Sequence, residues 1–254
     1  MSTGGARSRA RGTVDIGRPP RGRVELGLRT RVIAPLTSGS RGGLLDEAAA
    51  VGDEPVDLVE WRADSMVRAL AGSSFAAAPD LVGELTATAG ALLGASALPL
   101  IATVRTSSEG GAAHLDDSEY CALVASLAGM ADAVDVEIGR EGAPDLVREA
   151  QRAGARVIAS HHDFGGTPGD EELAGVLAAM NHAGADVLKI ACAPRSGGDV
   201  ARVLTAGAWA REAYDRPVIA IAMGRLGGPT RFAGAALGGA ATFASVGGAS
   251  APGQ

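Results

Sequence analysis

Short apolar segments alternate with amphipathic segments along almost all of this 254-residue chain. The clearest helices are Ser118–Met130, Pro144–Ala153, Asp170–Ala183 and Asp199–Tyr214, several with Asp or Ser near the start and Gly at the end. The expected strands are Arg31–Leu36, Asp57–Arg62, Leu100–Arg105, Ala133–Ile138, Arg156–His162, Val187–Cys192, Val218–Met223 and Ala241–Ser245. Strands that alternate with helices predict a parallel sheet, and eight of them in about 250 residues predict a closed (β/α)8 TIM barrel.

An open, doubly wound sheet is the alternative fold. Such a sheet is usually marked by a glycine-rich turn after its first strand, and the segment Leu36–Gly43 matches the GxGxxG pattern poorly. A length of 254 residues is also long for an ordinary domain but suits a single α/β barrel. The barrel is therefore the favoured prediction.

The chain divides into a tail and one domain. Residues 1–12 have no hydrophobic periodicity and are expected to be a disordered tail, although arginines there leave an RNA- or lipid-binding arm as an alternative. The remainder, residues 13–254, is expected to form a single barrel domain. Thr13–Ile16 and Arg23–Leu26 alternate in polarity around the turn-rich Gly17–Gly22, which predicts a β-hairpin over residues 13–26.

Composition limits the partners. The net charge of −6 argues against a nucleic-acid surface. No apolar run of about 18 residues and no signal peptide is present, so we expect no membrane association and a cytoplasmic location. Cys121 and Cys192 stand in apolar contexts without a CxxC spacing, which indicates neither a disulfide nor a metal site.

Lys189 is the only lysine of the chain, whereas the other 22 basic residues are arginine. It stands in the middle of the apolar strand Val187–Cys192. A desolvated lysine can lose its proton and attack a carbonyl carbon, which an arginine does not do at ordinary pH. The alternative is a lysine without function whose amine reaches solvent from the strand end. The apolar neighbours favour the first interpretation.

Charged residues gather near the ends of the expected strands. Catalytic groups of barrels lie at these C-terminal strand ends and in the loops that follow them, so this placement predicts a site at one mouth of the barrel. His161 and His162 are adjacent and should face opposite sides of their strand, but the alternation does not say which one faces the mouth. The residues in question are Glu60, Arg62, Arg105, Asp135, Glu137, His161, His162 and Lys189.

Several segments together resemble type I 3-dehydroquinate dehydratase, the Schiff-base dehydroquinase of the shikimate pathway. The similarity spans residues from about 31 to 254, with the motifs in the family's order. These motifs are Glu60-Trp-Arg-Ala-Asp64, Arg105-Thr-Ser-Ser-Glu-Gly-Gly111, Ser160-His-His-Asp-Phe164, Lys189-Ile-Ala and Ser250-Ala-Pro-Gly-Gln254. The resemblance implies elimination of water from 3-dehydroquinate to give 3-dehydroshikimate, in aromatic amino acid biosynthesis. It also places the hairpin as a plug at the bottom of the barrel.

The resemblance further implies catalytic roles for three residues. Lys189 matches the lysine that forms an imine with the C3 ketone. His162 matches the general acid/base that removes the C2 proton and assists loss of the C1 hydroxyl, and Glu109 matches the carboxylate that orients this histidine. His161 would then face the helices, or contact the catalytic residues without contacting the substrate.

Six further positions match substrate-binding residues of the family. Glu60, Arg62 and Arg105 match residues that hold the substrate hydroxyls and shape the charge around the lysine. Arg231 matches the arginine that pairs with the substrate carboxylate. Ser250 and Gln254 match the loop that closes over the substrate.

The expected chemistry agrees with these residue types. A protonated imine stabilises the carbanion formed next to it, histidine titrates near neutral pH, and an arginine fork binds both oxygens of a carboxylate. Burial near Arg62, Arg105 and Arg231 would disfavour the cation of Lys189. No metal or organic cofactor is expected, and the partner is a small-molecule substrate. Structural alternatives are a solvated loop carboxylate for Glu109 and an ion pair between Glu60 and Arg62 inside the barrel.

The chain departs from the family at its end. The family usually adds one more amphipathic helix after the last strand, and this final helix is missing from the sequence. The outer faces of the last and first strands would then lack a covering layer, which is an association hazard. A partner subunit (a homodimer is an open alternative) or the N-terminal extension would cover them, or the chain is a truncated form.

Two other functions compete with the dehydratase. A class I aldolase also uses a barrel lysine imine, and many such enzymes bind phosphate at the loops after strands seven and eight, where Gly227–Arg231 lies. A non-catalytic barrel that binds a shikimate-type ligand is the third interpretation, which the missing helix favours.

Overall fold

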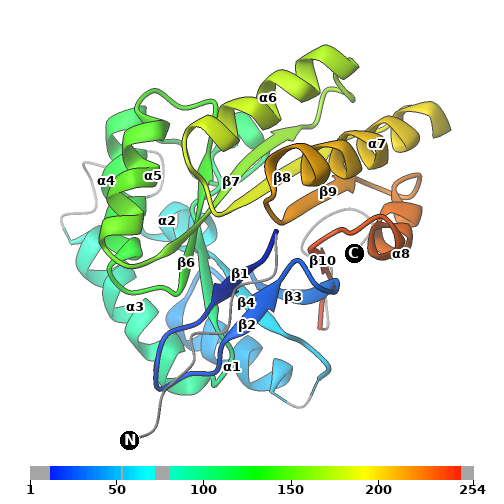
Figure 1. Cartoon of the computed structure of the whole chain (residues 1–254). Coiled ribbons are helices and arrows are strands. Elements are labelled where there is room, and N and C mark those ends of the chain that lie inside the picture. The colour runs from blue at the N-terminus through cyan, green and yellow to red at the C-terminus, as the bar shows by residue number, and fades with distance from the viewer. Residues whose placement is uncertain (1–11, 53, 72–79, 247–254) are drawn as a thin grey trace, which may run out of the picture.

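Eight parallel strands form a nearly closed barrel in this computed structural model, which describes residues 12–52, 54–71 and 80–246 (Figure 1). The strand order is β10-β3-β4-β5-β6-β7-β8-β9, and the main-chain NH of Ala240 donates to the carbonyl of Val218 across the remaining seam, at 2.8 Å. The strands are β3 (Arg31–Leu36), β4 (Leu58–Arg62), β5 (Leu100–Thr103), β6 (Ala133–Glu137), β7 (Arg156–Asp163), β8 (Val187–Cys192), β9 (Val218–Ala222) and β10 (Ala241–Phe243). The barrel predicted from the alternation is confirmed.

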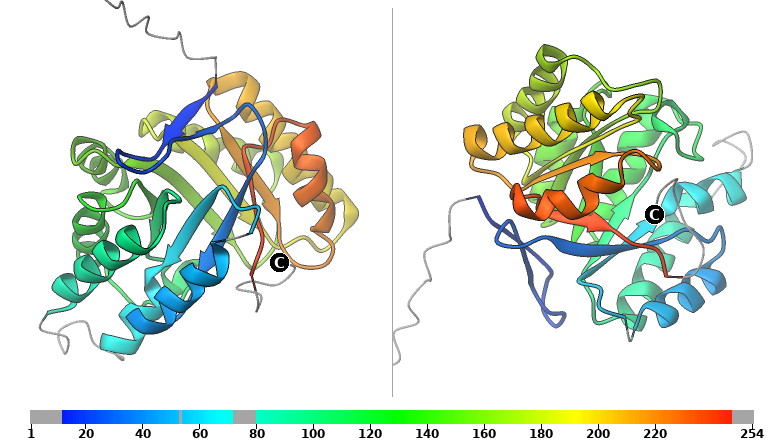
Figure 2. Two further views of the ribbon diagram at one scale, coloured as in Figure 1. Left: turned by 90° about the horizontal axis from the view of Figure 1, so that it is seen from below. Right: turned by 90° about the vertical axis from the view of Figure 1, so that its right-hand side faces the viewer.

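Helices surround the barrel and connect successive strands (Figure 2). Two of them begin with reciprocal capping boxes, in which Asp116 and Ser196 accept from the main-chain NH groups of Glu119 and Asp199. The helices are α1 (Arg41–Val51), α2 (Ala63–Ala71), α3 (Leu81–Ala95), α4 (Asp117–Ala128), α5 (Ala143–Arg152), α6 (Asp170–His182), α7 (Gly197–Tyr214) and α8 (Gly228–Ala236), with a short 3-10 turn η2 (Ser107–Glu109) after β5.

Alternation along the strands separates two apolar clusters. In β8, Leu188, Ile190 and Cys192 pack outward against the helices, whereas Val187 and Ala191 belong to the cluster inside the barrel. Lys189 lies between these two inner residues, so it faces inward by the same period of two. Aromatic residues are only 3% of the chain, and both clusters consist mainly of Ala, Val, Leu and Ile.

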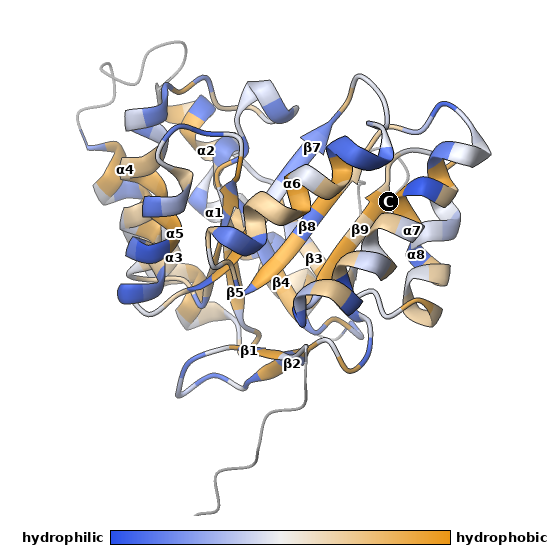
Figure 3. Cartoon of the chain, turned by 45° about the horizontal axis from the view of Figure 1, so that its top comes forward, coloured by the Kyte–Doolittle hydropathy of each residue, from blue (hydrophilic) through white to orange (hydrophobic). Residues whose placement is uncertain are grey.

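A β-hairpin closes the bottom of the barrel. Strands β1 (Val14–Ile16) and β2 (Val24–Leu26) pair antiparallel and lie below the barrel in Figure 3. Val14, Ile16 and Leu26 are buried with the inner residues at the lower ends of the strands. The mouth at the opposite end is therefore the open one.

The structure differs from the predicted elements mainly at their ends. The strand expected to end at Arg105 ends at Thr103, and the one expected to end at Ser245 ends at Phe243. Arg105 instead begins the loop that leads into η2. Helices α1, α2, α3 and α8 add to the four helices that the sequence predicts most clearly. Within the described residues, which end at Val246, no helix follows β10.

An ion pair fastens the hairpin to the barrel. Arg21 donates from both Nε and Nη2 to the carboxylate of Asp132, at 3.0 Å each, and Asp132 is fully buried. Asp132 also accepts from the main-chain NH of Leu100 at 2.9 Å, at the start of β5. The pair thus joins the hairpin turn to two strand starts.

Replacing Arg21 with Ala should lower the free energy of unfolding by about 2–4 kcal/mol, because it leaves a buried carboxylate without its counter-charge. Arg29→Ala is the matched control: Arg29 is 65% exposed, and its partner Asp57 keeps Arg31, so we expect a change below about 0.5 kcal/mol. Urea unfolding measures both values. Equal losses in the two variants would contradict the proposed role of Arg21.

Candidate active site

A pocket of about 620 Å³ opens at the C-terminal mouth of the barrel. Its wall combines charged groups with the apolar side chains of Ile221, Met223 and Phe243. Seven of the residues singled out in the sequence line it: Glu60, Arg62, Arg105, Glu109, His162, Lys189 and Arg231. Residues from six strands and from η2 thus meet in one place.

Two carboxylates contact the amine of Lys189. Its Nζ lies 3.0 Å from Oδ2 of Asp135 and 3.4 Å from Oε1 of Glu60, and it lies 4.9 Å above the ring of Phe243. Lys189 is 5% exposed. The expected effect of Arg62, Arg105 and Arg231 on its cation stays a prediction. The structure places carboxylates against Nζ, whereas Arg62 and Arg105 are themselves paired with carboxylates.

Arg105 is the centre of the buried polar network. Its Nη2 donates to Asp135 at 2.7 Å, and its Nη1 donates to Glu109 at 2.8 Å and to Glu137 at 3.2 Å. Ser160 accepts a further hydrogen bond from Nη1 at 3.0 Å. The carboxylates around Arg105 outweigh its burial and raise the pKa of its guanidinium above the usual value.

Ion pairs connect these groups into one network. Its buried carboxylates are Glu60, Glu109, Asp135 and Glu137, and its cations are Lys189, Arg105 and Arg140. Arg140 also pairs with the partly exposed Asp117, so carboxylates outnumber cations in the network. A buried excess of negative charge is costly, which favours a proton on one of the buried carboxylates.

Glu109 is the carboxylate whose surroundings favour this proton most. Burial raises the pKa of Glu109 to about 8, and the neighbouring Glu137 and Asp135 add to this rise while Arg105 opposes it. For Asp135, burial acts in the same direction, but Arg105 and Lys189 outweigh it and the pKa is lowered. The surplus proton therefore belongs beside the histidines and not beside the lysine.

Glu109 forms a carboxyl–imidazole pair with His162. Nδ1 of His162 lies 3.0 Å from Oε2 of Glu109, which leaves Nε2 of the ring for a molecule in the pocket. Burial and the charges of Arg105 and Lys189 lower the pKa of His162 well below its usual value of 6.5. The ring is therefore neutral at neutral pH and can accept a proton. A solvated Glu109, the structural alternative, is not observed, since this residue is only 8% exposed.

His161 also reaches Glu109. Its Nδ1 lies 3.8 Å from Oε1, the oxygen that His162 does not contact. Strand alternation alone turns His161 away from the pocket, and it does not line the pocket wall. The η2 turn, however, lies against the upper end of β7 and brings Glu109 between the two rings.

Arg62 and Arg231 have different surroundings. Nε and Nη2 of Arg62 donate to the two oxygens of Asp64, at 2.8 and 2.9 Å, so Arg62 pairs with Asp64 and not, as the structural alternative had it, with Glu60. Arg231 donates from Nη1 to the carbonyl of Phe243 at 3.1 Å, and its buried Nε has no partner within the described residues. Burial lowers the pKa of Arg231.

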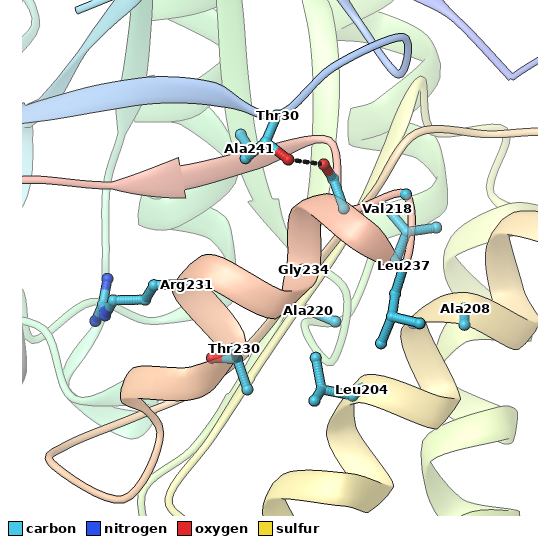
Figure 4. A pocket seen from close by; sticks show the side chains of 13 residues that line it. Thr30, Leu204, Ala208, Val218, Ala220, Thr230, Arg231, Gly234, Leu237 and Ala241 are labelled. Atoms are coloured by element: carbon cyan, nitrogen blue, oxygen red, sulfur yellow. Dashed lines mark hydrogen bonds between the residues drawn. The ribbon is translucent and has the colours of Figure 1, made fainter.

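A second cavity, of about 390 Å³, lies outside the barrel between α7, α8, β9 and β10 (Figure 4). Its wall consists mostly of small and aliphatic residues such as Leu204, Ala208 and Leu237, and Thr30 donates to the carbonyl of Gly239 at its edge. The side chain of Arg231 extends away from these three residues in Figure 4. The cavity contains no group comparable to the Lys189 and His162 cluster.

Three members of the site have no role assigned from the sequence. Asp135, which the sequence places only among the charged residues near the strand ends, contacts Lys189 directly. Ser160 bonds to Arg105, and Thr103 donates to Glu60 at 2.9 Å. All three belong to inward-facing positions of neighbouring strands. Thr103 lies opposite Asp135, and Ser160 lies opposite Glu137 on one side and Lys189 on the other. Strand register, had it been known, would have identified them.

Two expected site residues lie outside the described residues, namely Ser250 and Gln254. In the described part of the chain, no three His, Cys, Asp or Glu side chains are grouped as a metal ion would require. None of the described helices combines the length and apolarity that a membrane span needs.

A buried lysine and a carboxyl–imidazole pair at the C-terminal mouth of a (β/α)8 barrel form a site where TIM-barrel enzymes have their active sites. The family model for type I 3-dehydroquinase matches residues 32–254, and the chain belongs to this family. Members of the family are hydro-lyases, so family membership favours elimination of water over the aldolase and non-catalytic interpretations.

Named relatives agree with this assignment. The 3-dehydroquinate dehydratase of Klebsiella pneumoniae is 38% identical over 232 residues, which cover 89% of this chain and 88% of the relative. The crystal structure of 3-dehydroquinate dehydratase from Geobacillus kaustophilus has a TM-score of 0.82 at 34% identity, covering 91% and 88% of the two chains. A type I enzyme from Clostridium difficile, solved with covalent modified comenic acid, has a TM-score of 0.84 at 29% identity, covering 96% and 92%.

Gly110 controls the turn that presents Glu109. Its φ of 77° lies in the left-handed region, and an added Cβ would approach Cε2 of Phe164 to 2.2 Å. Gly110→Ala should lower the free energy of unfolding by about 1–2 kcal/mol from backbone strain, while the half-exposed Phe164 ring moves aside. Gly139→Ala, where a Cβ meets nothing within 4 Å, is the control and should change little. Indistinguishable urea midpoints for the two variants would refute this account.

Glu109 should make stability depend on pH in a defined direction. Its folded pKa of about 8 lies above the unfolded value of about 4.3, so the folded chain retains a proton that the unfolded chain releases between these values. The contribution of Glu109 to stability therefore falls as pH rises from about 4.3 to 8. Relative to wild type, Glu109→Gln should gain about 2–4 kcal/mol between pH 5 and pH 8.5. A difference that stays constant with pH would contradict the raised pKa.

Proposed function

We propose that this protein eliminates water from 3-dehydroquinate to give 3-dehydroshikimate through a Schiff base on Lys189, with His162 as general acid/base. The observation that carries the proposal is the convergence of Lys189, His162 and Glu109 on one pocket, which also contains Arg231. Family membership supplies the substrate, and the side chains supply the groups that the reaction requires. The roles below are inferred from this geometry.

Imine formation begins with loss of a proton from the Lys189 ammonium. The free Nζ attacks the C3 ketone, a C–N bond forms, and the ketone oxygen leaves as water. Asp135 and Glu60, both in contact with Nζ, then stabilise the positive charge of the protonated imine. The carboxylates that hold the ammonium in the resting site thus serve the iminium as well.

Elimination uses His162. Its Nε2 takes the C2 proton, and the electron pair of that C–H bond moves toward the iminium to form an enamine. As the enamine collapses, the C1–O bond breaks, and the proton on Nε2 leaves with the hydroxyl as water. Hydrolysis of the remaining imine releases the product and restores the Lys189 amine.

Substrate binding is assigned to the arginines and to Glu60. The guanidinium of Arg231 has an unpartnered Nε among the described residues, and we infer that it pairs with the substrate carboxylate. Arg62, Arg105 and Glu60 are positioned to hold hydroxyl groups. For Ser250 and Gln254, closure over the substrate stays a prediction, as do the cytoplasmic location and a homodimer.

The test traps the covalent intermediate. Borohydride added in the presence of 3-dehydroquinate should reduce the imine and increase the mass of the protein by one ligand, with the modification located on Lys189 by peptide mass spectrometry. His162→Ala should still be trapped but should lose at least about 100-fold in turnover, because proton transfer is the step removed.

Lys189→Met is the matched control, which should acquire no adduct and show no turnover. Turnover is followed by the absorbance of the conjugated product. An unmodified wild-type protein, or an adduct on another residue, would overturn the proposed mechanism. Absence of the absorbance change would overturn the proposed reaction.

A further inference from the structure

Two imidazoles share the carboxyl group of Glu109. Oε2 faces Nδ1 of His162 at 3.0 Å, and Oε1 faces Nδ1 of His161 at 3.8 Å. The side chain of His161 is 26% exposed, whereas that of His162 is 12% exposed. The carboxyl group therefore lies between a ring in the pocket and a ring nearer to solvent.

A single proton on Glu109 can reside on either oxygen, with opposite consequences for His162. A proton on Oε2 would donate to Nδ1 of His162, and the neutral ring would then hold its hydrogen on Nε2. That tautomer cannot accept the substrate proton at Nε2. A proton on Oε1 leaves Oε2 to accept from Nδ1–H, and the lone pair is then on Nε2, where a base requires it.

The position of Arg105 favours the second arrangement. Its Nη1 donates to Oε2 of Glu109 at 2.8 Å, and a guanidinium binds an unprotonated carboxyl oxygen more strongly, which favours the proton on Oε1. The other charged groups that act on Glu109 are Glu137, Asp135 and Lys189. Some described residues act on Glu109 by their charge, and others form ion pairs with it. Of all of them, His161 is the group that faces Oε1.

We propose that His161 is a positioning residue that accepts the Glu109 proton at Oε1 and thereby holds His162 in the Nδ1–H tautomer. A distance of 3.8 Å is longer than a hydrogen bond, so the contact is closed by a small rotation of the half-buried His161 ring. This inference rests on the proposed function, because it concerns the same general base.

The proposal includes a balanced proton movement. When Nε2 of His162 takes the C2 proton, the proton on Oε1 of Glu109 passes to Nδ1 of His161, which leaves a carboxylate beside the new His162 imidazolium. When His162 protonates the departing hydroxyl, the proton returns from His161 to Glu109. The three groups together gain one proton and lose one proton in each turnover.

The tautomer can be observed directly by NMR, because the chain contains four histidines. With ¹⁵N-labelled histidine at neutral pH and no substrate, the wild-type protein should show His162 as the Nδ1–H tautomer. His161→Phe should shift at least about half of the His162 population to the Nε2–H tautomer. His161→Gln, whose amide oxygen accepts a proton from the carboxyl group, should restore the wild-type tautomer.

Kinetics give the second measurement. We expect kcat of His161→Phe to fall about tenfold with KM little changed, and the exposed His182→Asn to behave as wild type in both experiments. An unchanged His162 tautomer in a folded His161→Phe protein would overturn the inference. The NMR result needs no turnover, so a wild-type protein with the Nδ1–H tautomer but without dehydratase activity would refute the proposed function alone.

Discussion

The buried guanidinium of Arg105 is the interaction on which the rest of the site depends. It contacts carboxylates from β6 and from η2, so a single side chain brings together Asp135, Glu137 and Glu109. Without this cation, three carboxylates in a low-dielectric interior could not remain close to one another. The network also positions both halves of the chemistry, since Asp135 contacts Lys189 and Glu109 contacts His162.

A surplus carboxylate separates the roles of the acids. Asp135 and Glu60 both contact the lysine nitrogen, and for Asp135 the charges of Arg105 and Lys189 outweigh burial and lower the pKa of its carboxyl group. Glu109 takes the excess proton because it is buried and has other carboxylates as neighbours. One group of like residues thus provides an anionic partner for the amine and a proton-holding partner for the imidazoles.

Alternation of side chains along the barrel strands places these charged groups inside the mouth. Inward positions at the lower ends of the strands are apolar and pack on the hairpin, whereas inward positions near the mouth are polar. The same alternation makes Glu60 and Lys189 face inward and packs Trp61 against the helices. The side chains that stabilise the barrel therefore lie near its bottom, whereas the reactive side chains lie at its mouth. The Arg21–Asp132 pair lies at the bottom, opposite to the site.

Much of the protein could be determined from the sequence alone. Eight apolar strands separated by helices define the barrel, because period-two and helical patterns are local properties. A single lysine in a strand, with acids and histidines near other strand ends, locates the mouth, and the family motifs select His162 over His161. Element ends were less predictable, because an apolar pattern does not by itself mark the residue at which a strand or helix ends.

Only the tertiary structure decided which charges meet. Arg62 pairs with Asp64 and not with Glu60, Lys189 lies between carboxylates and not between arginines, and His161 reaches Glu109 despite facing away along its strand. These contacts depend on strand register and on the path of the η2 turn, which join residues distant in sequence. Charge states follow from such contacts, so spacing along the chain does not determine them.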